Sequence, residues 1–84
     1  MAKGLTLRIL TPEGTVFEGA VDSVHVPGGA GRFEILPGHA PIVSSLLAGE
    51  LKWSEGGSLR SLPVRSGALM LKDNEISVCV ESAE

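Results

Sequence analysis

Glycine and proline interrupt this chain so often that long helices have almost no room to form. Eleven glycines and five prolines are spread over 84 residues, and residues 68–84 are the only interval longer than seven residues that contains neither. These two residue types are the least compatible with a helix interior. A helix bundle or coiled coil is therefore disfavoured, and the length supports a single domain over residues 1–84.

The readable segments alternate between apolar and polar residues with a period of two. Leu5, Leu7 and Ile9 alternate with Thr6 and Arg8, which places three aliphatic side chains on one face of a first strand. We expect further short strands at residues 15–18, 20–26, 32–36, 42–48, 51–53, 59–65, 67–71 and 76–80. The run 67–71 is apolar throughout, so we expect it to be covered on both faces.

Turn residues separate these segments. Such residues gather at 11–14, 27–31, 37–41, 55–58 and 72–75. In the third group, Pro37 and Pro41 fix the backbone on either side of Gly38, so this is the most constrained turn in the chain. Short strands joined by such turns predict an all-β fold, an antiparallel β-sandwich or flattened barrel of about 8–10 strands. One uncovered sheet edge suits a protein partner.

Charge and composition exclude several classes of partner. The net charge is −3 and no run of like charge occurs, which argues against nucleic acid or an anionic bilayer as the main partner. No apolar run approaches the roughly 20 residues of a membrane-spanning helix, so we expect no direct membrane insertion. The single cysteine, Cys79, allows no internal disulfide, which fits a reducing compartment.

The chain offers little for catalysis or for cofactors. No Gly-x-Ser-x-Gly elbow supports a serine nucleophile, and His25 and His39 lie too far apart in sequence, with one cysteine, for a metal-site spacing. Gly28 to Gly31 has neither a following Gly-Lys-Ser/Thr nor a following helix, so a plain turn is a better interpretation than a phosphate loop. We expect no catalytic residue, no cofactor, no metal and no ATP binding.

Four single residues each allow two interpretations. His39 is either an interface contact or a side chain whose ring nitrogens bond nearby backbone, and we favour the second. Trp53 is either a core residue or an interface anchor, with the core favoured. His25 is expected to face solvent, and Cys79 is expected to be half-buried and unreactive rather than a redox site.

One stretch is more specific than these patterns. The residues from Gly31 to Pro41, GRFEILPGHAP, resemble the signature segment of the epsilon subunit of F-type ATP synthases, which corresponds to the delta subunit of mitochondria. Further segments resemble the strands around that signature in the family. They are 5–10, 16–19, 24–28, 49–51 and 66–69. The resemblance covers practically the whole chain.

The resemblance implies a non-catalytic part of the central rotor stalk. In that family the N-terminal domain is a ten-stranded β-sandwich that binds the gamma subunit through one face and touches the polar loops of the c-ring with one end. It thereby helps to couple proton transport to ATP synthesis. The implied location is peripheral, on the cytoplasmic side of the bacterial inner membrane, within the complex.

The same resemblance marks partner-binding positions. Contact with the c-ring and gamma is expected from Gly31, Arg32, Glu34, His39 and Pro41. The position of Arg32 is commonly acidic in relatives, so its charge is reversed here. The family usually continues into a two-helix hairpin that inhibits ATP hydrolysis or binds ATP, and no C-terminal helical domain is present in these 84 residues, so we expect neither activity from them.

Two other functions remain as alternatives. A generic small β-sandwich module that binds a ligand or a protein would call for an exposed aromatic platform or an acidic metal cluster, which three aromatic residues and scattered acids do not readily supply. A small hydrolase would need a nucleophile motif. The rotor-stalk subunit is the function that the sequence favours.

Overall fold

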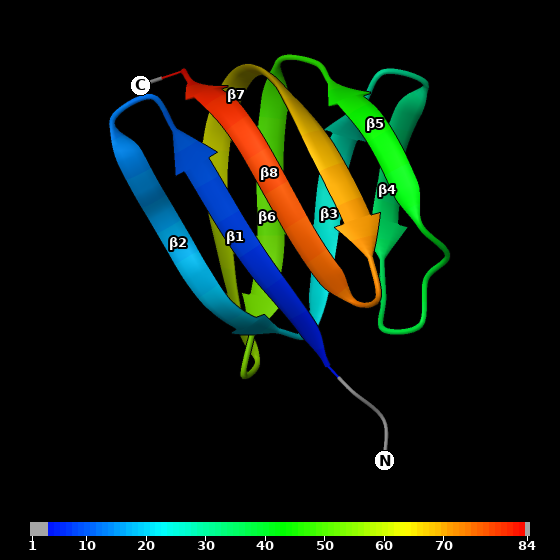
Figure 1. The fold of residues 1–84 in the computed structure, drawn as a ribbon. Helices are drawn as coiled ribbons and strands as arrows, with labels where there is room; N and C mark the ends of the chain where they lie inside the picture. Colours follow the sequence, from blue (N-terminus) through cyan, green and yellow to red (C-terminus); the bar gives the residue numbers. More distant parts are fainter. Residues whose placement is uncertain (1–3, 84) are drawn as a thin grey trace.

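Eight β-strands and no helix make up residues 4–83, the part of the chain that the computed structural model describes (Figure 1). The strands are β1 (Leu5–Thr11), β2 (Gly14–Val21), β3 (Ser23–Gly28), β4 (Gly31–Ile35), β5 (Ile42–Leu46), β6 (Gly49–Glu55), β7 (Ser58–Lys72) and β8 (Glu75–Ser82). The predicted all-β class and the predicted range of strand number are confirmed.

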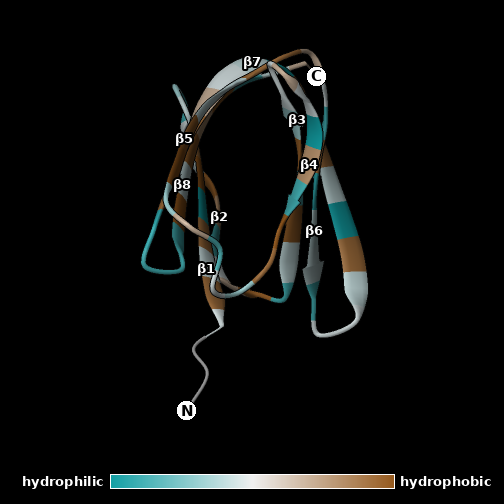
Figure 2. Cartoon of the chain, turned by 90° about the vertical axis from the view of Figure 1, so that its right-hand side faces the viewer, coloured by the Kyte–Doolittle hydropathy of each residue, from teal (hydrophilic) through white to brown (hydrophobic). Residues whose placement is uncertain are grey.

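The strands form two layers that share β7. One layer contains β2, β1, β8, the second half of β7 and β5, and the other contains β4, β3, β6 and the first half of β7. Figure 2 shows the two layers edge-on, with β7 arching from one to the other. The strand pairing of β7 with β8 shifts register between Val64 and Ser66, where the bend occurs. The prediction of separate strands at 59–65 and 67–71 was therefore wrong, because one bent strand of 15 residues serves both layers.

One strand pair departs from the expected antiparallel arrangement. β1 and β8 are parallel, with Thr6 opposite Glu75 and Leu10 opposite Cys79, whereas every other pair in the described chain is antiparallel. A parallel pair needs a long crossover connection. Here the connection between β1 and β8 is the rest of the domain.

The core lies between the two layers and follows the alternation of the sequence. The predicted faces of the first and last strands are buried, with Leu7, Ile9 and Val78 each 0% exposed. Trp53 is 3% exposed, which confirms its placement in the core. The other buried apolar side chains are Leu5, Val21, Val24, Val26, Ile35, Leu46, Leu51, Leu62, Val64, Leu69, Leu71, Ile76 and Val80. Each large aliphatic side chain contributes about 1.5–3 kcal/mol by its burial.

Three local predictions were wrong for physical reasons. Gly19 does not end a strand: it continues β2 opposite Leu7, and the Phe17 ring lies beside the space where a Cβ would stand. The run 67–71 is not covered on both faces, since Met70 is 57% exposed on the outer side. Cys79 is exposed rather than half-buried, because it alternates with Val78 and Val80 and so points outward.

Side chains rather than backbone hydrogen bonds close one side of the sandwich, between β2 and the first half of β7. Phe17 of β2 lies against Trp53, with ring centroids 5.1 Å apart. The Arg60 guanidinium lies over both rings, 5.6 Å from the Phe17 centroid and 5.8 Å from the Trp53 centroid. Its Nη1 also forms an ion pair with Oε1 of Glu55, at 3.2 Å. Arg60 therefore acts as a cover over the edge of the core.

Removing this cover should weaken the fold by a measurable amount. Arg60→Ala is expected to lower the free energy of unfolding in urea by about 1 kcal/mol, since exposed cation–π contacts contribute about 0.5–1 kcal/mol each. Tryptophan fluorescence of the folded protein should shift to the red. Arg8→Ala is the matched control, because Arg8 is also an exposed arginine beside a glutamate, Glu18. An equal loss in both variants would show that Arg60 covers nothing.

Candidate functional site: surfaces for partner binding

The five residues predicted to bind partners are all exposed but do not form one cluster. Gly31 and Arg32 begin β4 at one end of the sandwich (Figure 1). Glu34 lies further along the same strand. His39 and Pro41 lie in the connection from β4 to β5, at the opposite end. A single partner that touches all five positions would have to run along the length of the sandwich.

Arg32 and Glu34 share one outward face of β4, but each has its own partner. They lie opposite Pro27 and His25 of β3. Arg32 donates from Nη2 to the backbone carbonyl of Glu50 at 3.1 Å. The Oε2 of Glu34 is 3.3 Å from Nε2 of His25. The first of these contacts holds the guanidinium beside the start of β6 and leaves most of its hydrogen-bonding capacity for solvent or a partner.

Residues 36–41 form a loop fixed by the β7–β8 turn. Gly38 has φ of 87° and donates its N–H to the Asn74 side-chain oxygen at 2.8 Å. The His39 N–H donates to the Leu36 carbonyl, and the Nδ1 of His39 is 2.8 Å from the Ala40 carbonyl oxygen. One ring nitrogen of His39 thus bonds nearby backbone, as the favoured interpretation expected, while the exposed side chain can still meet a partner.

The glycine cluster at the other end is explained by close packing. A Cβ on Gly28 would stand 2.6 Å from the Phe33 ring, and one on Gly29 would stand 2.6 Å from the Ser45 hydroxyl. Two backbone hydrogen bonds join the loops at this end, the β3–β4 turn and the β5–β6 connection. The Gly29 N–H donates to the Ser45 carbonyl, and the Leu47 N–H donates to the Pro27 carbonyl. A packed turn accounts for these glycines without a phosphate.

An exposed surface without charge is the feature that the sequence-based search for sites missed. It lies in the middle of the outer face of β5, β7 and β8, where Val43 lies opposite Met70, and Met70 lies opposite Ser77. The next row places Ser45 opposite Ala68 and Ala68 opposite Cys79. We call these six residues the uncharged patch: Val43, Ser45, Ala68, Met70, Ser77 and Cys79. The alternation at 76–80 already pointed Ser77 and Cys79 away from the core.

Two side chains of the uncharged patch are unusually exposed for their type. Val43 is 81% exposed and Met70 is 57% exposed. Beside them is a shallow hollow of about 240 Å³, lined by Pro41, Ile42, Leu71 and Lys72 as well as by these two residues. Contiguous apolar surface of this kind marks interaction sites in small soluble proteins. The hollow also brings Pro41, one of the predicted residues, to the edge of the patch.

A group of charged residues lies on the outer face of the other layer. It carries charges of both signs, from Arg32 and Glu34 of β4 to Glu50 and Lys52 of β6, with His25 between them. Lys52 Nζ is 3.7 Å from Glu50 Oε1. Charged side chains interspersed in this way are typical of a sheet face in contact with water. The uncharged patch and this group of charged residues are thus suited to different surroundings.

Comparison with known proteins identifies the family. The model of the ATP synthase delta/epsilon chain β-sandwich domain matches residues 4–84. The chain belongs to this family. The predicted resemblance to the epsilon subunit is confirmed.

Curated epsilon chains match along the whole length of this delta/epsilon domain. The ATP synthase epsilon chain of Nitratidesulfovibrio vulgaris is 42% identical over 84 residues, and that of Desulfitobacterium hafniense is 34% identical over 84 residues. That of Leptospira interrogans is 41% identical over 80 residues, or 95% of this chain. The chain spans 64%, 63% and 63% of the Desulfitobacterium, Nitratidesulfovibrio and Leptospira proteins, respectively.

Solved structures share the fold of the delta/epsilon domain. A chain of the Tetrahymena thermophila mitochondrial ATP synthase central stalk and c-ring matches with a TM-score of 0.82 at 12% identity, over 96% of this chain and 66% of that one. A chain of the Euglena gracilis mitochondrial ATP synthase matches with a TM-score of 0.86 at 18% identity, over 92% and 50%. At these identities the likeness concerns the fold.

Two further observations concern residues 4–83 alone. That part of the chain contains no helix with the length and hydropathy to cross a membrane. It also contains no group of three or more histidine, cysteine or acidic residues placed to hold a metal ion.

Proposed function

We propose that this domain is a non-catalytic central-stalk subunit of an F-type ATP synthase. It binds the gamma subunit and the c-ring, and so couples proton transport to ATP synthesis. It resides peripherally on the cytoplasmic side of the bacterial inner membrane, as part of the complex, and neither binds ATP nor inserts into the bilayer. Family membership over residues 4–84 is the observation that carries this proposal.

The uncharged patch supports gamma binding through the outer face of β5, β7 and β8. Burying a charge against a partner is costly unless it is paired, whereas burying Val43 and Met70 is favourable. Met70 is a side chain that adapts to irregular surfaces. On this proposal, His39 and Pro41 extend the gamma contact at the end of β5, beside the hollow of the patch.

The end formed by residues 28–31 and 47–49 supports contact with the c-ring. Its side chains are small or apolar, and the nearest cation is Arg32, whose Nη1 is 3.8 Å from the Cβ position of Gly49. A guanidinium with free donors pairs well with carboxylates and carbonyl oxygens. We therefore expect the ring loop that meets Arg32 to be acidic or rich in exposed carbonyls.

Titration calorimetry with purified gamma subunit tests the proposed function. The domain is expected to bind gamma with a 1:1 stoichiometry and a negative heat-capacity change, because apolar surface is buried. A gamma subunit that is folded and yet binds nothing would contradict the proposal. Copurification from the source cells with an unrelated protein in place of gamma would favour the generic binding module.

Charge reversal at the ring end tests the second contact. The double variant Arg32→Glu with Glu34→Arg should leave the melting temperature almost unchanged, since exposed ion pairs contribute under about 1 kcal/mol. Coupling of proton flow to ATP synthesis in membranes should fall. Crosslinking from position 32 to the ring should fall as well. If both readouts match those of the unmodified protein, these residues face only solvent.

A further inference from the structure

The side of the sandwich that Phe17, Trp53 and Arg60 close presents two strand edges that face one another. Within residues 4–83, β2 pairs only with β1, and residues 59–62 of β7 pair only with β6. The two edges are close, because Arg60 of β7 lies over Phe17 of β2 and because Leu62 and Val16 line one cavity. No backbone pairing joins β2 to β7 in this part of the chain. Unpaired strand edges are templates for a further strand.

Within the described residues, β8 ends where this unpaired edge begins. β8 follows β7 as far as Val64 opposite Ser82, and the Ala83 N–H donates to the Pro63 carbonyl at 3.0 Å. Successive residues of a strand direct their backbone groups to opposite sides. The backbone N–H and C=O of Ser61 therefore point to the same side of β7 as the Pro63 carbonyl. They lie just beyond the last described hydrogen bond between β7 and residue 83.

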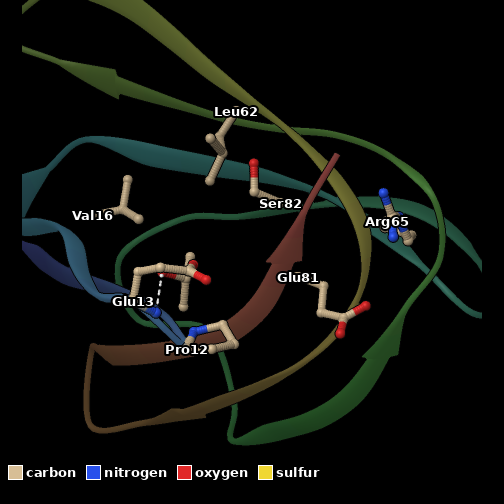
Figure 3. Close-up of a pocket in the computed structure, with 8 residues that line it drawn as sticks. Pro12, Glu13, Val16, Leu62, Arg65, Glu81 and Ser82 are labelled. Carbon is tan, nitrogen blue, oxygen red and sulfur yellow. Dashed lines mark hydrogen bonds between the residues drawn. The ribbon is translucent and has the colours of Figure 1, made fainter. Parts of the chain in front are cut away.

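A cavity of about 500 Å³ lies at this position (Figure 3). Leu62 and Val16 supply apolar wall, and Val16 is 46% exposed. Glu13, Glu81 and Arg65 also line the cavity, and none of the three takes part in an ion pair within the described residues. Two carboxylates against one guanidinium leave the rim with an excess of negative charge.

A buried hydrogen-bond donor without an acceptor lies on the same side of the sandwich, between β2 and β7. The indole Nε1 of Trp53 has no hydrogen-bond partner in the described chain, although the side chain is 3% exposed. Trp53 contacts Phe17 and Arg60, the residues whose side chains close this side of the sandwich. A buried N–H without an acceptor is rare and costs free energy until an acceptor arrives.

We propose that the seam between β2 and residues 59–62 of β7 binds an extended segment of the gamma subunit as an added strand. The segment runs antiparallel to β7, in line with β8. It places an apolar side chain against Leu62 and Val16 and a lysine or arginine between Glu13 and Glu81. Strand addition of this kind gives affinity through main-chain hydrogen bonds and specificity through alternate side chains. The inference rests on the proposed function, which supplies gamma as the partner.

Hydrogen exchange on the assembled complex tests the added strand. The full 84-residue chain is measured by mass spectrometry alone and with purified gamma. Exchange in peptides covering residues 14–18 and 58–62 should slow by roughly tenfold or more in the complex, as expected for newly bonded amides. Protection that grows with the concentration of the isolated chain would instead assign the seam to a second copy and overturn the proposal.

The same measurement separates this inference from the proposed function. Protection confined to the strands of the uncharged patch, β5, β8 and the second half of β7, would support gamma binding and overturn the added strand. Absence of any complex would overturn both.

Charge reversal adds a second readout, since Glu13→Lys with Glu81→Lys should weaken gamma binding roughly tenfold. Glu50→Lys, on the outer face of the other layer, is the matched control and should leave the affinity unchanged. Equal affinities in all three proteins would overturn the proposal.

Discussion

Met70→Glu is expected to weaken gamma binding roughly hundredfold, which corresponds to about 2.8 kcal/mol. The side chain is 57% exposed and points away from the core, so the free domain should keep its stability. In the complex, the new carboxylate would be buried against apolar surface without a partner. Calorimetric titration of gamma measures the affinity, and thermal unfolding of the free variant checks the fold.

Lys52→Glu is the matched control for this experiment. The Lys52 side chain is 40% exposed and belongs to β6, on the outer face of the other layer. The substitution places the same new side chain outside both the uncharged patch and the seam. We expect full gamma affinity. If the two variants lose affinity equally, or if neither does, the uncharged patch is not the gamma-binding surface.

Gly67→Ala should destabilise the domain by about 2 kcal/mol, because overpacking a tight site usually costs 1–3 kcal/mol. A Cβ at this position would stand 2.5 Å from the Cys79 carbonyl oxygen and 3.1 Å from the Cα of Val80. Both atoms belong to the backbone of β8, so the strand itself must shift. In a domain of this size, each kcal/mol lowers the melting temperature by about 4–8 °C.

Gly4→Ala controls for the general effect of replacing a glycine. Nothing lies within 4 Å of the Cβ position of Gly4, so this variant should melt at the unmodified temperature. Circular dichroism during heating measures both variants. If Gly67→Ala had the same melting temperature as Gly4→Ala, β8 could move away from β7 near the bend without loss of stability.

The alternation of the sequence sufficed to predict most of the core. Leu5, Leu7 and Ile9 were placed inward by their spacing alone, and all three are buried. The turn at Pro37 to Pro41 was predicted from the two prolines around Gly38. What fixes that loop was not predictable, because Asn74 comes from a turn more than thirty residues away in the chain. Local patterns specify local conformation, whereas such a contact depends on the finished fold.

The outer faces were harder to predict than the core. The run 67–71 is apolar on both alternations, so the sequence pattern indicated burial on both faces. The domain itself covers only one of them and leaves Met70 exposed. The sequence pattern does not distinguish an apolar side chain that is buried within the domain from one that is exposed and is buried only by another protein. Cys79 was misplaced because a cysteine is usually buried.

The parallel pairing of β1 with β8 has a consequence for synthesis in the cell. Leu7 of the first strand pairs with Ile76 near the end of the chain, so the middle of this layer cannot form until β8 is present. Pairing over such a separation is slow, because the loop between the strands must be ordered first. While the ribosome is still translating, the β1–β2 hairpin has an apolar face and no neighbour for it. A chaperone that acts on nascent chains would therefore meet this hairpin before the ribosome has added β8.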